Sequence, residues 1–143
     1  MLIEYLLDTC IVIELLHGDQ GVKKWLEDNR EAILNISGWT VVELLKHKKS
    51  QKEMQITLKN LTQHKVLWTD PKIADEIPAL LINHFHTHRT KEGELSGNAV
   101  FDALIYTTAK SYNQKLVTRD KDFNPLKDIE VINLDKIKDG VYK

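Results

Sequence analysis

Short apolar runs that alternate with segments of helical periodicity are the feature that most limits how this chain can fold. The runs are too short for buried helices and are rich in branched apolar side chains, which is typical of buried strands. Five such runs lie at residues 2–7, 32–37, 65–68, 115–118 and 129–134. Because strands that alternate with helices form parallel sheets covered on both faces, we predict an α/β fold with a central parallel sheet of about four to five strands flanked by helices.

The segments between these runs carry apolar residues at helical spacing, with recognisable start and stop signals. Gly18 follows the first helical segment, Pro71 suits a helix start, and Pro78 predicts a turn, a kink or a second start. The best loop candidate is residues 90–97, which contains two glycines. The predicted helices lie at residues 10–17, 21–30, 40–49, 51–62 and 98–112. No repeat or linker interrupts this order, so residues 1–143 are predicted to form a single domain.

Composition narrows the class of protein and its compartment. The 143 residues suffice to bury a core, and a formal net charge of −1 means that any surface for nucleic acid has to be local. The single cysteine, Cys10, excludes an internal disulfide and fits a reducing compartment. Glu4 and Asp8 break the first apolar run too early for a secretory signal, and no stretch approaches the roughly 20 apolar residues of a membrane span. We therefore predict a cytoplasmic protein without a membrane segment.

Two aspartates directly follow strands of the predicted sheet. Asp8 ends the first apolar run, and Asp120 comes just after the run at residues 115–118. Taken singly, Asp8 suits a helix N-cap and Asp120 suits a turn. Ligands of open parallel sheets bind outside the carboxyl ends of the strands, so both carboxylates are expected at the edge where ligands bind.

Two further acids, Glu43 and Asp102, lie early in predicted helices. A crossover helix runs antiparallel to its strands, so its N-terminus is expected at the same edge of the sheet. The alternative for each acid alone is a first-turn carboxylate that the helix dipole stabilises by less than about 1 kcal/mol. Asp102 is unusual because its helix is apolar over much of its circumference, which predicts burial. The sequence thus predicts that four carboxylates, from positions 8 to 120, converge on one edge of the sheet.

Clustered carboxylates repel one another, and a divalent cation removes that conflict. Ligands that are all oxygen atoms favour a hard ion such as Mg²⁺ or Mn²⁺, which keeps several waters and accepts phosphate oxygens. Such a metal lowers the pKa of a bound water and stabilises the charge that develops during phosphodiester hydrolysis. Hydrolysis of a phosphodiester with one or two metal ions is therefore the predicted chemistry.

Four stretches of the chain together resemble the PIN-domain nucleases, in particular the VapC-type toxins of bacterial and archaeal toxin–antitoxin pairs. The stretches are LLDTCIVIELL, ISGWTVVELL, NAVFDALIYTTA and KLVTRDKDF. The resemblance covers the chain from the first strand to about residue 125. The helix after the third acid reads LIYTTAK, where the family usually has IAATA, and residues 50–97 carry no stretch that aligns with the family.

The resemblance implies which residues would form the active site. The acids that would bind the metal and carry catalysis are Asp8, Glu43, Asp102 and Asp120. Asp122 matches a further, more variable metal-binding acid, while Thr9 and Thr118 match hydroxyl positions that would orient carboxylates or water. The resemblance also implies an Mg²⁺- or Mn²⁺-dependent endoribonuclease with an RNA substrate. Such proteins frequently form homodimers and are inhibited by a cognate antitoxin protein.

Other functions fit parts of the same sequence. The domain could be a non-toxin RNA-processing nuclease, a structure-specific DNA nuclease, or a non-catalytic RNA-binding module. The presence of all four acids argues against a loss of catalysis. A receiver-like domain that handles phosphate also gathers acids at strand ends, but the chain has no suitable lysine at the end of a late strand.

Several residues outside the acidic set are candidates for secondary roles. Lysines within residues 46–52 suit RNA phosphates or, more simply, a solvated helix end. Three histidines occur at alternate positions: His84, His86 and His88. On a helix, His84 and His88 would share a face and could bind a transition metal. Because no acid or cysteine adjoins them in sequence, we prefer a surface or RNA-facing role to a zinc site. Cys10 lacks an activating base nearby and is interpreted as structural. The tryptophans interpreted as core or interface residues are Trp25, Trp39 and Trp68.

Overall fold

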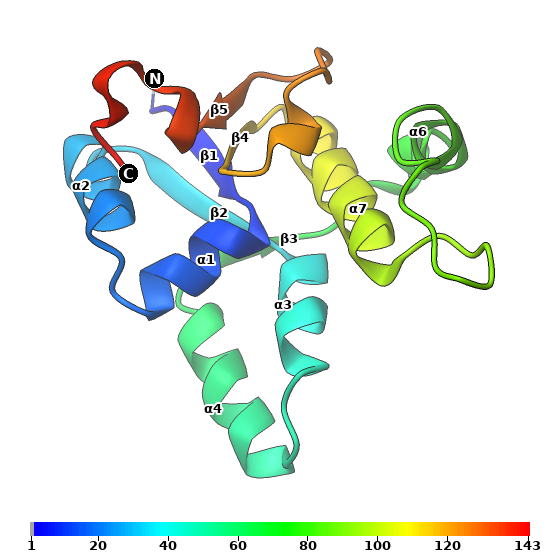
Figure 1. Cartoon of the computed structure of the whole chain (residues 1–143). Helices are drawn as coiled ribbons and strands as arrows, with labels where there is room; N and C mark the ends of the chain where they lie inside the picture. The colour runs from blue at the N-terminus through cyan, green and yellow to red at the C-terminus, as the bar shows by residue number, and fades with distance from the viewer. Residues whose placement is uncertain (1) are drawn as a thin grey trace.

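The structure, a computed structural model, describes residues 2–143; Met1, the first residue of the predicted domain, lies outside the described residues. Five parallel strands form one sheet in the order β3-β2-β1-β4-β5 (Figure 1). The strands are β1 (Glu4–Leu7), β2 (Ile33–Ser37), β3 (Lys65–Leu67), β4 (Lys115–Thr118) and β5 (Val131–Asn133). The predicted parallel sheet is confirmed, and no strand end lies more than two residues from its predicted place.

Helices cover both faces of the sheet, as predicted (Figure 1). They are α1 (Thr9–Leu16), α2 (Gln20–Asp28), α3 (Gly38–Leu45), α4 (Gln51–Leu61), α5 (Pro71–Ala74), α6 (Ile77–Asn83) and α7 (Gly97–Ser111). Short 3₁₀ helices follow the last two strands: η1 (Lys121–Phe123), η2 (Leu134–Lys136) and η3 (Lys138–Gly140). Among residues 2–143, no helix combines the length and the apolar character that crossing a membrane requires.

Local capping decides two boundaries that the sequence pattern left open or placed wrongly. The helix predicted at 40–49 ends at Leu45, because a new helix starts after Ser50. The Ser50 hydroxyl accepts a hydrogen bond from the N–H of Glu53, and the Glu53 carboxylate accepts one from the N–H of Lys49. Pro78 lies in the first turn of α6, where backbone N–H groups make no hydrogen bonds within the helix, so a residue without an N–H costs nothing there. Pro78 therefore marks a second helix start.

Alternation of side chains along the strands divides the core into two layers. Leu7 and Val117 belong to the layer that α1, α2, α3 and α4 cover. Leu6 and Leu116, one position earlier on the same strands, belong to the layer of α7. Successive side chains of a strand point to opposite faces, so strands that are buried on both sides read as continuous apolar runs. This burial explains why the strands were recognisable in the sequence.

The tryptophans hold the helices against the sheet in different ways. Trp25 is buried and packs edge-on against Tyr5, with 4.9 Å between ring centroids. Trp39 packs edge-on against Trp68, which is half exposed. The Trp68 ring also lies so close to the first residue of α3, Gly38, that a Cβ there would come within 2.3 Å of it. Only glycine allows this approach, which fixes the start of the helix that carries Glu43.

The strand order reverses between β1 and β4, and this reversal positions the candidate site. After β1 the chain adds β2 and β3 on one side, then crosses over to add β4 and β5 on the other side. In open α/β sheets, ligands bind outside the carboxyl ends of the strands at such a reversal. Asp8 comes directly after β1, and Asp120 lies two residues beyond β4. The two strand-end acids therefore flank the place where the fold favours a ligand.

Candidate functional site

Asp8 is a buried carboxylate at the end of β1 that also caps α1. Its backbone N–H donates to the carbonyl of Val117, and its Oδ1 accepts a hydrogen bond from the N–H of Thr9. The hydroxyl of Thr118, the last residue of β4, donates to Asp8 Oδ2 at 2.7 Å. Only 3% of Asp8 is exposed, and this burial raises the pKa of its carboxyl to about 6, although the hydrogen bonds favour the charged form.

The hydroxyl of Thr118 joins the first and the last of the four acids. It donates to Asp8 and accepts a hydrogen bond from the backbone N–H of Asp120 at 2.9 Å. Asp120 in turn caps η1, where its Oδ1 accepts from the N–H of Asp122 at 2.9 Å. Both strand-end acids thus have the local capping role that the sequence offered as an alternative, and one hydroxyl links them at the edge of the sheet.

Glu43 and Asp102 lie deeper in their helices than predicted. Each is the sixth residue of its helix, in α3 and α7, which is two positions deeper than predicted for Glu43 and one position deeper for Asp102. Neither helix has an acid in its first turn, and the dipole of a helix N-terminus acts only there. The dipole therefore does not account for these carboxylates. Glu43 Oε1 is moreover buried without a hydrogen-bond partner among residues 2–143, which is costly for a polar atom.

The raised pKa of Asp102 shows that the other predicted acids lie near its carboxyl group. Burial and, after it, the negative charges of the other acids together raise the pKa of this carboxyl to about 8. In decreasing order of effect, these acids are Asp8, Asp120, Glu43 and Asp122. All four charges act on one half-buried carboxyl, although they come from four different parts of the chain. The structure therefore brings the predicted acids into one electrostatic environment at the carboxyl edge of the sheet.

The acids fit a hard divalent cation by their chemistry, although their side chains do not close around one point. Within residues 2–143, no group of three or more His, Cys, Asp or Glu side chains is arranged closely enough to hold a metal ion. The available donors are nevertheless all carboxylate oxygens, and one of them is the unpaired, buried Oε1 of Glu43. A cation would relieve the repulsion that Asp102 experiences.

Thr9 and Cys10 follow Asp8, but they contact different partners. The Thr9 hydroxyl pairs with that of Thr40 at 3.0 Å and so links α1 to α3, and only its backbone N–H reaches Asp8. The Cys10 thiol donates to Asp8 Oδ2 at 3.4 Å. Burial and the charge of Asp8 raise the pKa of this thiol far above its usual range. A protonated thiol is not a nucleophile, in agreement with the structural interpretation of Cys10.

Two of the histidines lie against Asp122, which sequence reasoning missed. Helix α6 ends at Asn83, so the prediction that His84 and His88 share a helix face is wrong. They are also not without an acid, because His84 Nε2 donates to the backbone carbonyl of Asp122 and His88 Nε2 donates to its Oδ2 at 3.0 Å. His88 and Asp122 are 34 residues apart, so their adjacency is a product of the fold that no local pattern signals.

The lysine cluster begins beside the acidic edge. Lys46 is the C-cap of α3, and residues 46–50 form the turn before α4. Lys46 Nζ lies 4.9 Å from the ring centroid of Phe101, the residue that precedes Asp102. The helix-end role proposed for these lysines is therefore present for Lys46, and the same ammonium group lies next to the helix turn that carries Asp102.

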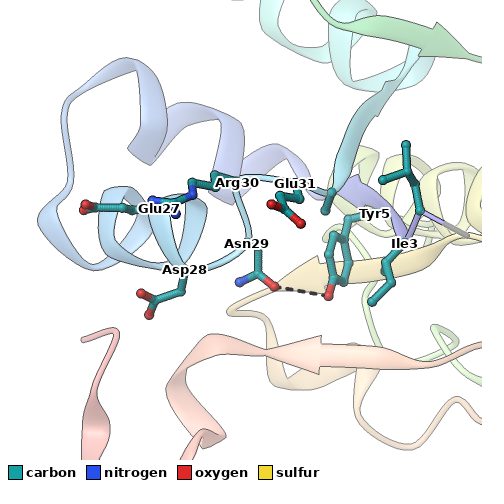
Figure 2. Close-up of a pocket in the computed structure, with 9 residues that line it drawn as sticks. Ile3, Tyr5, Glu27, Asp28, Asn29, Arg30 and Glu31 are labelled. Atoms are coloured by element: carbon teal, nitrogen blue, oxygen red, sulfur yellow. Dashed lines mark hydrogen bonds between the residues drawn. The ribbon is translucent and has the colours of Figure 1, made fainter.

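A separate surface pocket lies at the opposite end of the strands. It has a volume of about 620 Å³ and is lined by Ile3, Tyr5, Asn29 and Glu31, among others (Figure 2). Two of these lining residues are hydrogen-bonded to each other, because the Tyr5 hydroxyl donates to Asn29 Oδ1 at 3.4 Å (Figure 2). None of the predicted acids lines this pocket. Because parallel sheets bind ligands at their carboxyl edge, the acids and not this pocket form the candidate site.

Solved structures with the same fold include proteins of toxin–antitoxin systems. A toxin–antitoxin complex from Klebsiella pneumoniae is 27% identical, with a TM-score of 0.64 over 87% of this chain and 94% of that chain. VapBC-1 from nontypeable Haemophilus influenzae is 22% identical, with a TM-score of 0.67 over 92% of this chain and 98% of that chain. VapBC2 from Rickettsia felis, bound to a promoter DNA fragment, is 21% identical, with a TM-score of 0.65 over 90% and 97%.

Sequence comparison assigns the family. Among curated proteins, no sequence matches the chain. The PIN domain family, however, matches residues 5–129, a span that runs from β1 to just before β5 and includes the acids at positions 8, 43, 102, 120 and 122. The matched span covers most of the chain, and the structural neighbours share its fold. The chain therefore belongs to the PIN-domain family.

Proposed function

We propose that the protein is a metal-dependent endoribonuclease that hydrolyses RNA phosphodiester bonds and is the toxin of a type II toxin–antitoxin pair. PIN domains are nucleases, and the similar complex from Klebsiella pneumoniae is a toxin–antitoxin complex. The observation that carries the proposal is the set of uncompensated carboxylates around Asp102. Asp8 and Asp120 also cap α1 and η1, but capping does not require the acids to share one site, where like charges oppose folding.

The proposed catalytic set consists of the four acids, which hold Mg²⁺ or Mn²⁺ directly or through water: Asp8, Glu43, Asp102 and Asp120. Thr118 keeps the Asp8 carboxylate in place, and Asp122 supports the set from η1. A bound metal would supply a water of lowered pKa and positive charge opposite the phosphate. With a pKa of about 8, the Asp102 carboxyl holds a proton at neutral pH in the metal-free protein, and a bound cation would favour its charged form.

The surfaces around these acids support the proposed substrate and partners. Lys46 and the lysines that follow it supply the local positive charge that RNA phosphates need in a chain of net charge −1. Exposed apolar side chains on α1, α3 and α4 suit a protein partner, which we propose to be the cognate antitoxin or the second subunit of a homodimer. They are Ile13, Leu16, Val42, Met54, Ile56 and Leu58. We further propose that residues 1–143 form one domain and that the protein acts in the cytoplasm.

Cleavage of total RNA with mapping of the cut sites tests this function. We expect cleavage with Mg²⁺ or Mn²⁺ and none after chelation. Asp102→Asn should lose at least about 10-fold in activity, since losing a ligand costs no less than losing a group that orients one. Glu14→Gln, a carboxylate on α1 that is paired with an arginine, is the matched control and keeps its activity. Intact RNA, or full activity in both Asp8→Asn and Asp102→Asn, would overturn the proposal.

The same material separates the alternatives. Cleavage of structured DNA in preference to RNA would indicate a DNA nuclease, and RNA binding without cleavage would indicate a binding module. Growth arrest on expression that Asp102→Asn relieves, together with a neighbouring small reading frame whose product suppresses the arrest, is expected of a toxin. Cleavage without growth arrest would instead indicate an RNA-processing enzyme.

A further inference from the structure

A short segment after α6 is anchored against the turn that follows β4. We call His84, Phe85 and His88 the histidine clamp. Phe85 is fully buried, and its ring lies edge-on to that of Phe123 in η1, with 6.4 Å between centroids. Both imidazoles pack edge-on against Phe85, at 4.5 Å for His84 and 5.8 Å for His88. The clamp is therefore held to η1 by buried aromatic packing and not by its histidines alone.

The clamp and Asp120 together restrain Asp122 at three of its atoms. The N–H of Asp122 donates to Asp120 Oδ1, its carbonyl accepts from His84 Nε2, and its Oδ2 accepts from His88 Nε2. Within residues 2–143, no hydrogen bond engages the other carboxylate oxygen, Oδ1. One oxygen of Asp122 is thus held by a histidine while the second stays available.

A contribution to folding does not explain the contact between His88 and Asp122. The two side chains are 37% and 33% exposed, and ion pairs with that exposure contribute little to stability. The neighbouring aromatic packing already fixes the segment. The Asp122 charge is felt at Asp102, so the carboxylate that His88 orients belongs to the acidic edge. Its orientation is what the contact determines.

We propose that His88 is a positioning residue: by holding Oδ2 of Asp122, it presents Oδ1 of that carboxylate to the metal ion or to a water bound to the metal. The inference rests on the proposed metal-dependent function and extends it to residues 50–97, which carry none of the stretches that resemble the family. Carboxylates that bind metals are commonly held by a hydrogen bond of this kind, and its loss weakens metal binding by about 10- to 100-fold.

Calorimetric titration of the full chain with Mn²⁺, without RNA, tests the role of His88. We expect His88→Ala to weaken Mn²⁺ binding by about 10-fold or more. His88→Gln keeps an N–H donor and should restore the affinity, and His86→Ala, an exposed neighbour, should match the unsubstituted chain. In an Asp122→Asn background, His88→Ala should cause no further loss. Unchanged affinity in His88→Ala, or an equal loss in His88→Gln, would overturn the proposal.

A second measurement does not depend on the folding of any variant. In the unsubstituted protein, Mg²⁺ should shift the ring nitrogen resonances of His88 and leave those of His86 unchanged; equal shifts in both would contradict the inference. The outcomes also separate this inference from the proposed function. If Mn²⁺ binding is lost in Asp102→Asn but kept in His88→Ala, only the role of His88 fails. If the unsubstituted chain binds no Mn²⁺, both proposals fail.

Discussion

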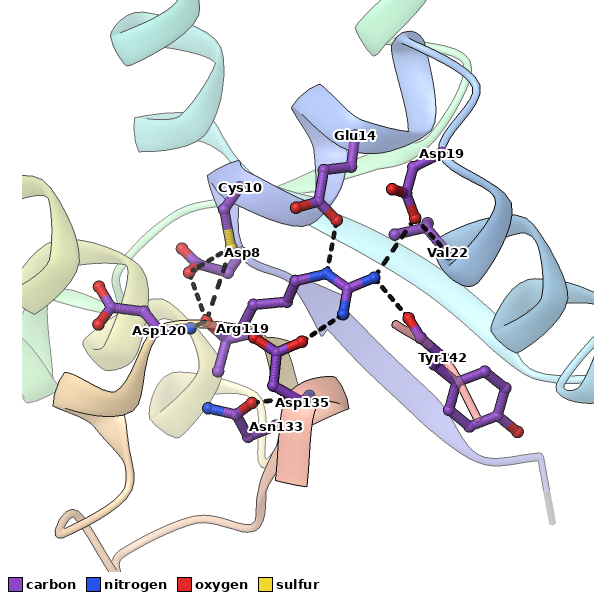
Figure 3. Close-up of polar contacts among 11 residues, drawn as sticks. Asp8, Cys10, Glu14, Asp19, Val22, Arg119, Asp120, Asn133, Asp135 and Tyr142 are labelled. Atoms are coloured by element: carbon purple, nitrogen blue, oxygen red, sulfur yellow. Dashed lines mark hydrogen bonds and ion pairs between the residues drawn. The ribbon is translucent and has the colours of Figure 1, made fainter. Parts of the chain in front are cut away.

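Arg119 and Asp120 are neighbours in sequence, but they belong to two carboxylate clusters whose charge is compensated differently. The Arg119 guanidinium contacts Glu14 at 2.7 Å, Asp135 at 2.6 Å and Asp19 at 3.3 Å (Figure 3). The second cluster is the acidic edge, whose four predicted acids are Asp8, Glu43, Asp102 and Asp120. Within residues 2–143, no lysine or arginine forms an ion pair with its four acids.

The first cluster is part of the architecture. Besides its three carboxylates, Arg119 Nη2 donates to the carbonyl of Tyr142 at 2.7 Å, so that one side chain ties α1, η2 and the C-terminal segment to the end of β4 (Figure 3). The same carbonyl lies so close to Gly21 that a Cβ there would come within 2.0 Å of it. Where carboxylates hold the fold together, this chain supplies its own cation. Around Asp102, no lysine or arginine among residues 2–143 plays this part, which is what the proposed metal site would require.

The largest expected effect on stability comes from removing the cation of the architectural cluster. Arg119→Met leaves three carboxylates without a partner, and breaking a buried ion pair from one side commonly costs 3 to 5 kcal/mol. The carboxylates are 31–47% exposed, so screening by water reduces this cost to about 3 kcal/mol. Urea unfolding measures it as a lower midpoint. An unchanged midpoint would mean that the Arg119 cluster does not stabilise the fold, and the two clusters would then not differ in this respect.

Supplying a cation to the acidic edge should have a nearly equal effect in the opposite direction. A ligand that binds only the folded state at 100 times its dissociation constant stabilises that state by about 2.7 kcal/mol. Mn²⁺ at that concentration should therefore raise the free energy of unfolding of the unsubstituted chain and of Glu14→Gln alike. Asp102→Asn should show little of this increase in the same urea titration. Equal stabilisation of Asp102→Asn would place the metal elsewhere.

The parts of the molecule that local chemistry controls were predictable from the sequence. The strands are recognisable because they are buried on both faces, and the α/β order then places Asp8 and Asp120 at one edge. Helix positions were less predictable. The end of α3 depends on the start of α4, where Ser50 accepts from the N–H of Glu53 and Glu53 accepts from the N–H of Lys49; an apolar pattern does not contain these contacts.

Contacts between distant parts of the chain could not be predicted in this way. The guanidinium of Arg119 reaches Glu14 across 105 residues, and no sequence signal distinguishes it from an exposed arginine. The contact of His88 with Asp122 is of the same kind. Glu43 lies two positions deeper in its helix than the sequence pattern indicated. Its position at the sheet edge follows from the packing of α3, including the close approach of Gly38 to Trp68.

The smallest of the three expected effects is the change in the free energy of unfolding when Asp102 is replaced, and its sign depends on whether the chain itself compensates the Asp102 charge. The pKa of Asp102 is raised from 3.8 to about 8 in the folded, metal-free protein, first by burial and then by the neighbouring acids. Between these two pH values the folded state binds more protons than the unfolded state, so the contribution of Asp102 to stability is lost as the pH rises through that window. Asparagine carries no charge and removes this loss.

In the presence of a chelator, Asp102→Asn should therefore stabilise the protein at pH 9 by about 1 to 2 kcal/mol and have little effect at pH 4. The energy at pH 9 is smaller than the pKa shift alone would give, because the Asp102 side chain is partly exposed and water screens its charge. Glu14→Gln removes a compensated charge and should destabilise the protein slightly at pH 9. Urea unfolding at both pH values measures the two changes. If Asp102→Asn destabilises the metal-free protein at pH 9, its carboxylate is compensated within the chain, and an external cation is not needed to explain the acidic edge.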